Sequence, residues 1–384
     1  MNTKYIIENV HLYQEGEFTP CGSYSLVING DKIEAICPNE ESLSSELPMI
    51  DGKASYVIPG MIDCHNHVSL DVKLENYLER MNHAEMELAM IAFRTLREDL
   101  HSGVTTSRCM GERHFLDVFC RKAIKEGMLE GPDLKVSGIG LRASHGHGYI
   151  GMPFDGVQAL IQAVRNNVHQ GVDWIKYYST ASAPMADGKT IVSFYTEQEI
   201  AAIIEEAHRS NKKVTTHCIG GEALQVSLRN GVDCIEHVYF ADEKDINTLL
   251  KYNTTVCLTP TEYFVDNENA PAGYRSTMVP HRSRVEESMR MVIENQIPFV
   301  LGTDGSHGKL WLEASLVSGF GAGAREIIDA LTIRAAKLLG IDSHTGMIKS
   351  GYDADLVLLS DNPLNNIENL KEIQAVYKKG KLVG

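Results

Sequence analysis

Val57-Ile58-Pro59-Gly60-Met61-Ile62-Asp63-Cys64-His65-Asn66-His67 is the stretch that decides the fold. It begins with an apolar segment of strand character, Val57–Ile62, and ends in polar residues. Residues two apart in an extended segment point to the same side, so His65 and His67 can face one point. The stretch predicts a buried strand that carries two imidazoles at its carboxyl end.

Seven more strand-like segments follow this one, and helical stretches follow most of them. We expect the strands at Val104–Cys109, Leu134–Ile139, Trp174–Tyr178, Lys213–Cys218, Cys234–Val238, Thr254–Leu258 and Phe299–Thr303. We expect helices at Leu74–His101, His114–Gly127, Val157–Gln170, Glu197–Asn211, Glu222–Asn230, Asp242–Tyr252, Arg284–Asn295 and Ala324–Leu339. This alternation predicts an α/β fold with a parallel sheet, and eight repeats suit a (β/α)8 TIM barrel of ~250 residues. An open doubly wound sheet is the alternative, which the absence of G-x-G-x-x-G after the first strand weakens.

Both ends of the chain have a different pattern, with short alternating segments that are typical of β-structure. These are Lys4–Val10, Ser23–Ile28 and Lys32–Cys37 at one end, and Gly346–Lys349, Ala354–Leu359 and Ala375–Lys379 at the other. Chain termini often lie close together, so the two sets can pair in one domain. We therefore predict a small β-sandwich made of residues 1–56 and 346–384, and a catalytic barrel over residues 57–345.

Composition excludes several classes of partner. The 36 Lys and Arg residues against 51 Asp and Glu residues give a net charge of −15, which repels nucleic acid and anionic membrane surfaces. No basic segment followed by an apolar one opens the chain, and no apolar run reaches the ~20 residues that span a bilayer. The eight cysteines include no C-x-x-C pair, which indicates reduced thiols and a cytoplasmic protein.

The expected strand ends carry residues that bind metals. Besides His65 and His67, strand five ends at His217, strand six at His237 and strand eight at Asp304. Reactive side chains of a barrel enzyme lie at the carboxyl ends of its strands, and imidazoles with a carboxylate are common metal ligands. A single His there is more often a core residue, but this whole set predicts a metal site.

Lys176 on strand four is an unusual neighbour for a metal, because an ammonium repels cations. Burial lowers the pKa of a lysine, and the neutral amine can then add carbon dioxide and become a carbamate. Such a carbamate has two oxygens and could bridge two divalent ions. The alternative is a structural lysine paired with Asp173 or Glu236.

Together these motifs resemble the amidohydrolase superfamily, in particular its imidazolonepropionase-related, prolidase-like branch. The first strand and its H-x-H look like the opening motif, and Gly346–Val357 is similar to the C-terminal signature. The resemblance implies two zinc ions in each chain. One would be bound by His65, His67 and Asp304 and the other by His217 and His237, with carbamylated Lys176 and a hydroxide bridging them.

The function implied by this resemblance is hydrolysis of an amide bond in a small molecule, most simply a dipeptide or an N-acyl amino acid, by metal-activated hydroxide. Asp304 would move the proton from the nucleophile to the leaving nitrogen. The alternatives are a cyclic amide hydrolase of the imidazolonepropionase type, a lactonase or phosphotriesterase, and a deaminase with one metal. A non-catalytic relative is disfavoured, since every expected ligand position is filled. We also expect a homo-oligomer.

Candidate substrate contacts are harder to derive. The loop Ser144-His145-Gly146-His147-Gly148-Tyr149 resembles the His-containing loop of the branch, so His145 or His147 is expected to polarise the scissile carbonyl or to contact the substrate. The alternative is a flexible turn with solvated histidines. We further assign substrate binding to Arg142, to Tyr239 and, on the long segment from Thr259 to His281, to Tyr263. One departure from the branch is Ile219, because many relatives that bind an amino-acid carboxylate have Tyr at this position.

Overall fold

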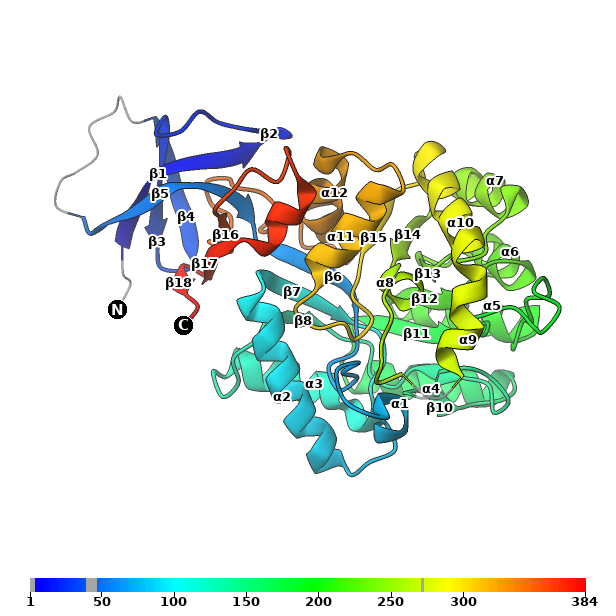
Figure 1. The fold of residues 1–384 in the computed structure, drawn as a ribbon. Helices are drawn as coiled ribbons and strands as arrows, with labels where there is room; N and C mark the ends of the chain where they lie inside the picture. Colours follow the sequence, from blue (N-terminus) through cyan, green and yellow to red (C-terminus); the bar gives the residue numbers. More distant parts are fainter. Residues whose placement is uncertain (1–3, 39–46, 149, 271–272) are drawn as a thin grey trace.

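The computed structural model describes residues 4–38, 47–148, 150–270 and 273–384 of the chain. Tyr149, at the end of the predicted His-containing loop, lies outside the described residues. Two parallel sheets and one mixed sheet make up the β-structure, and helices connect the parallel strands (Figure 1). The chain therefore has the α/β fold that the sequence predicts.

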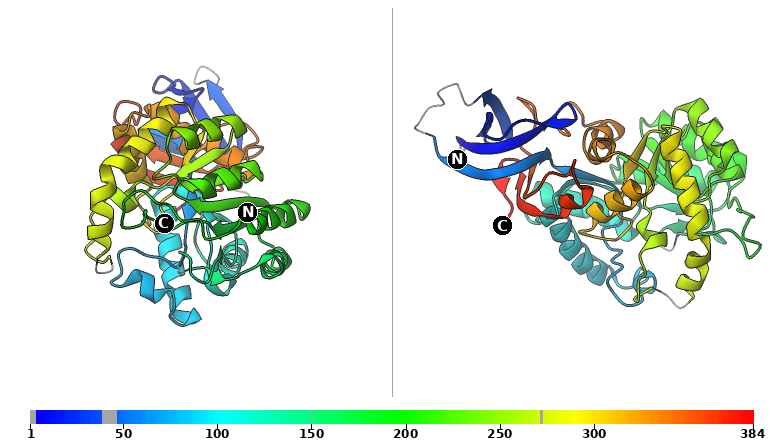
Figure 2. Two further views of the ribbon diagram at one scale, coloured as in Figure 1. Left: turned by 90° about the vertical axis from the view of Figure 1, so that its right-hand side faces the viewer. Right: turned by 45° about the horizontal axis from the view of Figure 1, so that its top comes forward.

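The strands at the two ends of the chain form one sheet of eight strands, in which β16 pairs antiparallel with β5 and so joins the C-terminal to the N-terminal segment. Figure 2 keeps the blue and red segments together at one end of the molecule. The strands are β1 (Lys4–Gln14), β2 (Glu17–Phe18), β3 (Tyr24–Asn29), β4 (Lys32–Pro38), β5 (Met49–Pro59), β16 (Leu356–Leu359), β17 (Ile373–Lys378) and β18 (Lys381–Leu382).

Parallel pairing organises the middle of the chain. One sheet contains β6 (Met61–Asn66), β7 (Val104–Cys109) and β8 (Asp133–Lys135). The other has the order β10 (Met152–Pro153), β9 (Leu141–Arg142), β11 (Trp174–Tyr178), β12 (Lys213–Cys218), β13 (Cys234–His237), β14 (Thr255–Leu258) and β15 (Phe299–Leu301). The two sheets meet where the Asp304 amide, just after β15, donates a hydrogen bond of 2.8 Å to the His65 carbonyl on β6.

Amphipathic helices follow the parallel strands, and their apolar faces are buried. Two of them begin with reciprocal capping boxes, at Thr196 before α5 and at Asp242 before α7. The α-helices are α1 (Tyr77–Arg80), α2 (Glu85–His101), α3 (Leu116–Lys125), α4 (Val157–His169), α5 (Glu197–Arg209), α6 (Glu222–Arg229), α7 (Glu243–Tyr252), α8 (Thr261–Phe264), α9 (Tyr274–Met278), α10 (Arg282–Glu294), α11 (Leu310–Gly319), α12 (Ala324–Leu331) and α13 (Ile333–Leu339). Short 3-10 helices cover Arg113–Phe115, Val279–His281 and Ile367–Lys371. None of the helices in the described ranges is long and apolar enough to cross a membrane.

The strand that we expect over Val57–Ile62 is in fact parts of two strands. β5 ends at Pro59 in the mixed sheet, and β6 begins at Met61 in a parallel sheet. Gly60 lies between them, and a Cβ there would come within 2.1 Å of the Thr105 hydroxyl oxygen. The chain passes from the mixed sheet to the parallel sheet at Pro59-Gly60. Its backbone comes so close to Thr105 there that only a glycine fits at position 60.

Other expected elements also differ from the structure. The helix expected over Ala324–Leu339 is divided at Thr332 into α12 and α13, and the strand expected over Phe299–Thr303 ends at Leu301. β8 stops at Lys135, since the Ser137 and Gly138 amides donate hydrogen bonds to the Asp117 carboxylate and not to a strand. The helix expected over Leu74–His101 is interrupted between α1 and α2, where Ala84 has extended backbone. Gly346–Lys349 is not a strand.

An alanine substitution of Ile58 tests whether β5 pairs with β16 and so joins the two ends of the chain. The Ile58 side chain is fully buried on β5, opposite Val357 of β16. Ile58→Ala should lower the free energy of unfolding by about 2–5 kcal/mol, because it leaves a cavity. The matched control is Ile50→Ala on the same strand, where the side chain is 37% exposed and the expected change is within about 0.5 kcal/mol. Equal effects of the two variants in urea unfolding would contradict the buried pairing.

Candidate active site

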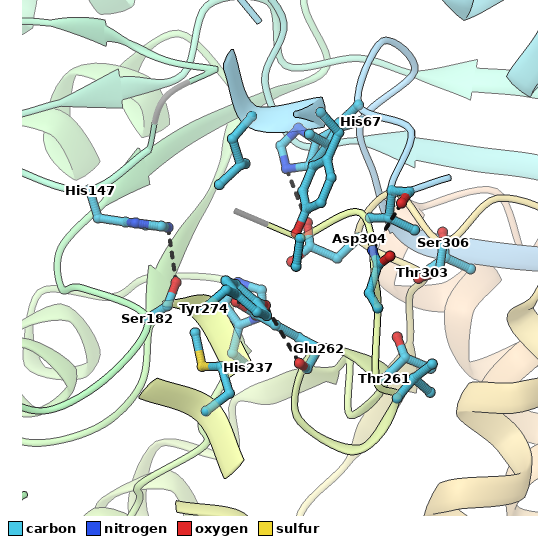
Figure 3. A pocket seen from close by; sticks show the side chains of 18 of the residues that line it. His67, His147, Ser182, His237, Thr261, Glu262, Tyr274, Thr303, Asp304 and Ser306 are labelled. Carbon is cyan, nitrogen blue, oxygen red and sulfur yellow. Dashed lines mark hydrogen bonds and ion pairs between the residues drawn. The ribbon is translucent and has the colours of Figure 1, made fainter. Parts of the chain in front are cut away.

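Side chains from five strands or strand ends meet around one cavity of about 1290 Å³. Figure 3 shows His67, His147, His237 and Asp304 around it. The structure brings together all the predicted metal-ligand residues in its lining: His65, His67, Lys176, His217, His237 and Asp304. These residues belong to β6, β11, β12 and β13 or directly follow β6 and β15, as expected for carboxyl ends of parallel strands.

One carboxylate oxygen of Asp304 lies at the same distance from two imidazole nitrogens. Oδ1 of Asp304 lies 3.4 Å from Nε2 of His65 and 3.4 Å from Nε2 of His67. Atoms bound about 2.1 Å from a tetrahedral zinc ion would be about 3.4 Å apart. Each of the two distances therefore fits a pair of ligands on one such ion. The ligand atoms of His65, His237 and Asp304 all lie within 4.8 Å of one another, so His237 is close to this group as well.

The short hydrogen bonds of these two histidines engage Nδ1, and Nε2 of His65 makes a longer contact of 3.5 Å with Nζ of Lys176. Nδ1 of His65 lies 2.7 Å from the Glu236 carboxylate, and Nδ1 of His67 lies 2.8 Å from the Gly111 carbonyl. An acceptor at Nδ1 holds the proton there, so the lone pair of Nε2 faces the cavity. Glu236 and Gly111 thus orient both rings for metal binding.

His217 and His237 form a second pair of potential ligands, with ring centroids 4.4 Å apart. Nδ1 of His237 contacts the Thr259 hydroxyl at 2.7 Å, whereas its buried Nε2 has no hydrogen-bond partner among the residues that the structure describes. In His217 the engaged atom is Nε2, which lies 3.3 Å from the Ala181 carbonyl. A buried nitrogen without a partner costs free energy unless a ligand satisfies it, and a metal ion would do so.

Lys176 is fully buried between these histidines, with Nζ 3.5 Å from Nε2 of His65. Burial lowers the pKa of Lys176 to about 8, although the Glu236 and Asp304 carboxylates act in the opposite direction. A substantial neutral fraction of the amine therefore exists near neutral pH. The free amine is the form that can react with carbon dioxide.

Burial also sets the charge of the other groups. It lowers the pKa of His67 to about 3 and that of His147 to about 4, so both imidazoles are neutral. For Asp304, burial and then the nearby Glu262 charge raise the pKa to about 8. The site thus combines neutral nitrogen donors with a carboxyl group that can change its protonation near neutral pH.

Two of these residues have unusual backbone conformations. His237 has φ 81° and Asp304 has φ 48°, in the left-handed region that residues other than glycine rarely adopt. Val238, with φ 49°, follows His237 and ends β13 one residue earlier than we expect from the sequence. Such strain persists only where the surrounding structure imposes it, and it commonly occurs at functional sites.

The predicted substrate contacts are only partly brought together. His147 lines the cavity, and its Nε2 lies 3.1 Å from the Ser182 hydroxyl. His145 is exposed and packs edge-on against Phe194, outside the cavity lining. The Arg142 guanidinium also lies outside this lining, because it donates hydrogen bonds to nearby carbonyls such as that of Gly151.

Tyr239 and Tyr263 are buried behind the wall of the cavity and do not line it. The Tyr263 hydroxyl donates to the Ser182 carbonyl, and the Tyr239 hydroxyl donates to the Glu262 carboxylate at 2.8 Å. Both tyrosines therefore contact residues that line the cavity, and their direct contact with a substrate stays a prediction.

Two further residues of this site were not assigned an individual role from the sequence. Glu262 lines the cavity, and it lies on the long segment from Thr259 to His281 that the sequence predicts to face the substrate. Arg108 is fully buried on β7, where its guanidinium donates hydrogen bonds to the Cys64 carbonyl at 2.6 Å and to Glu236 at 2.7 Å. An arginine inside an apolar strand indicates a buried carboxylate partner, although the sequence does not say which one.

Comparison with known proteins decides the family. A profile of the amidohydrolase family matches residues 56–383 of the chain. The chain belongs to the amidohydrolase family. It is therefore an amide-hydrolysing enzyme, and members of this family typically use a metal, for which the residues above are candidates.

Individual relatives of this amidohydrolase have different named activities. It is 26% identical to ochratoxinase from Aspergillus niger, over 96% of this chain and 84% of that protein. It is 21% identical to imidazolonepropionase from Shewanella frigidimarina, over 90% of this chain and 88% of that one. A solved Xaa-Pro dipeptidase with bound methionine superimposes with a TM-score of 0.86 at 24% identity, covering 99% of both chains, which shows a shared fold.

A substitution of Arg108 tests how much its buried ion pair with Glu236 contributes to stability. Arg108→Met should lower the free energy of unfolding by about 3–5 kcal/mol, because Glu236 then stays buried without its cation. The control is Arg165→Met, in which a 61% exposed side chain loses its pairing with Glu206 at a cost of up to about 1 kcal/mol. Urea unfolding of the metal-free variants measures both. An Arg108→Met variant as stable as the wild type would contradict this account of the ion pair.

Proposed function

We propose that this amidohydrolase hydrolyses the amide bond of a dipeptide or an N-acyl amino acid, with two zinc ions bound at the ends of its parallel strands. The observation that carries the proposal is the equal spacing of Asp304 Oδ1 from Nε2 of His65 and of His67, at 3.4 Å. The buried, unpartnered Nε2 of His237 supports a second ion beside the first.

The donor set divides between the two ions. His65, His67 and Asp304 would hold one, and His217 with His237 would hold the other. When bound, such ions polarise a carbonyl and lower the pKa of water, so that it becomes a nucleophile near neutral pH. Lys176 lies beside both sets of ligands, so its carbamate would bridge the two ions.

Lys176 forms this carbamate through its neutral amine. The amine nitrogen makes a bond to the carbon of carbon dioxide and releases a proton, and the product carries one negative charge on two oxygens. This conversion replaces a cation with an anion among the ligands. It removes the repulsion that a buried ammonium would exert on divalent ions.

Asp304 and His147 are the residues that we assign to proton transfer and to substrate orientation. Asp304 accepts the proton of the attacking water and donates it to the leaving nitrogen, a role for which its position beside His65 and His67 is suitable. His147 lies with its ring centroid 4.6 Å from that of His217 and lines the cavity. From there its imidazole can donate a hydrogen bond to the scissile carbonyl.

Lys309 is our candidate for binding the substrate carboxylate. Ile219 cannot supply a hydroxyl group, and it is fully buried. Lys309 lines the cavity and is half-buried, and in the described part of the chain its ammonium has no acidic partner. A dipeptide or an N-acyl amino acid would provide the missing carboxylate.

The proposal also includes a barrel and a small β-domain. We interpret the two parallel sheets as one (β/α)8 barrel, supported by the hydrogen bond from the Asp304 amide to the His65 carbonyl between β15 and β6. The terminal segments, residues 1–56 and 346–384, would form the small β-domain. β5 continues to Pro59 in the mixed sheet, which favours a boundary slightly later than residue 57. Homo-oligomerisation and a cytoplasmic location stay predictions.

Asp304→Asn tests the proton transfer. The variant should keep its fold, because the asparagine has the same size, and should lose about 10²–10⁴-fold in kcat. Turnover of a dipeptide and N-acyl amino acid library by zinc-loaded protein measures this loss, with circular dichroism as the control for folding. Retention of most of the kcat would remove Asp304 from this role.

Lys176→Ala should lose bound metal and activity together, measured by elemental analysis and turnover. The wild-type protein prepared with zinc and bicarbonate should contain close to two metal ions per chain. Short carboxylic acids at high concentration should partly restore the alanine variant, since they supply a bridging carboxylate. Lys176→Arg is the matched control and should not be restored, because a guanidinium stays charged. An arginine variant with two metals and near-native turnover would refute the carbamate.

A further inference from the structure

Glu262 is a charged residue of the cavity to which the proposed reaction gives no role. It lies on α8, directly after β14, and its half-buried side chain lines the cavity. Figure 3 shows it on the same side of the cavity as Tyr274 and His237. Its carboxylate is therefore within reach of a molecule bound in the cavity.

The hydrogen-bond partners of Glu262 are neutral. The Tyr239 hydroxyl donates to Oε2 at 2.8 Å, and the Tyr274 hydroxyl donates to Oε1 at 3.1 Å. Both bonds orient the carboxylate and favour its ionised form, whereas burial acts in the opposite direction and raises the pKa of Glu262 above its usual value. In the part of the chain that the structure describes, Glu262 makes no ion pair with a lysine, an arginine or a histidine.

Two other acidic or basic groups of the cavity wall differ from Glu262, because each has a partner of opposite charge. The Asp266 carboxylate lies 2.6 Å from the Arg282 guanidinium, and Lys73 pairs with Glu98. A carboxylate in a partly dry site without a cation is unfavourable, and the cost is removed when a ligand supplies the positive charge. Glu262 is thus set up to receive a cation.

Glu262 lies close to the residues that we assign to the reaction. The ring of Tyr239 stacks on the ring of His237 with centroids 5.1 Å apart, and the Tyr239 hydroxyl holds Glu262. One tyrosine ring therefore separates the carboxylate from a proposed metal ligand. Glu262 is therefore close enough to the proposed metal site for one small molecule to reach both.

We propose that Glu262 forms a cation-binding subsite, which takes a positively charged ammonium or guanidinium group of the substrate; this rests on the proposed function. Tyr239 and Tyr274 are positioning residues that hold the carboxylate. The cation is either the α-ammonium of a dipeptide or the charged end of a lysine or arginine side chain. The substrate class is then a cationic amide, and a neutral amide of the same size is disfavoured.

Pairs of substrates that differ only in one charge test the subsite. The first pair is alanyl-leucine and propionyl-leucine, which differ in the α-ammonium. The second is acetyl-lysine and acetyl-norleucine, which differ in the side-chain ammonium. Zinc-loaded wild-type protein should prefer the charged member of one pair by at least about tenfold in kcat/KM, the effect of one charge-assisted hydrogen bond.

Glu262→Gln should abolish this preference, so that the charged and the neutral member of the pair have equal kcat/KM, since the amide has the same shape but no charge. Asp266→Asn is the matched control, because it removes a cavity-lining carboxylate that already has a cation, and it should keep the preference. Equal turnover of both members of both pairs by the wild type, or a preference that survives in Glu262→Gln, would overturn the subsite.

Binding measured without turnover separates this inference from the proposed function. Ketomethylene analogues of the same pairs cannot be hydrolysed, and calorimetry gives their Kd values. A charge preference in Kd that Glu262→Gln removes supports the subsite even if no amide in the panel is hydrolysed, which would refute only the proposed function. Equal Kd values for charged and neutral analogues in the wild type would overturn the subsite.

Discussion

The close contact between the chain after β15 and the end of β6 is the constraint on which the site depends. A Cβ at Gly302 would lie 2.3 Å from Cβ of His65, so only glycine fits there. The Asp304 amide then donates to the His65 carbonyl, and the Thr303 hydroxyl donates to the Asp63 carboxylate at 2.6 Å. These contacts bring the Asp304 carboxylate to both histidines, although the residues are more than two hundred positions apart in the chain.

The site also depends on charged side chains that are buried together. Arg108 neutralises Glu236, and Glu236 in turn orients His65 through Nδ1. Because this chain of contacts is dry, each member depends on the next, and removal of one leaves a buried charge without a partner. The same dryness keeps the imidazoles neutral and lowers the pKa of Lys176. One physical cause therefore prepares nitrogen ligands and a reactive amine together.

The cavity in front of these residues explains why family membership alone does not name a substrate. The relatives include an ochratoxinase and an imidazolonepropionase, so one fold accommodates different amides. The metal-ligand candidates come from strand ends, whereas Glu262 and Lys309 lie on segments after the strands. Such segments vary without disturbing the core, and the charges that they carry are what we expect to select the substrate.

The sequence by itself determined the alternation of strands and helices and the residues at the strand ends, because periodicity and residue type are local properties. His65, His67, Lys176, His217, His237 and Asp304 could all be selected in this way, and they line one cavity. The family could also be recognised from these motifs. The division of Val57–Ile62 between β5 and β6 at Pro59-Gly60 could not be predicted, because both halves of this segment have the same apolar pattern.

Only the tertiary structure decided which residues of the loops face the cavity. His145 and His147 are equivalent in sequence, yet one packs on Phe194 and the other contacts Ser182, as the path of the loop dictates. Tyr239 and Tyr263 are behind the wall, and Glu262 is in front of it. Contacts between segments far apart in the chain set these directions, and a linear pattern contains no information on such contacts. The pairing of Arg108 with Glu236 is of the same kind, since two distant strands must adjoin before the charges can meet.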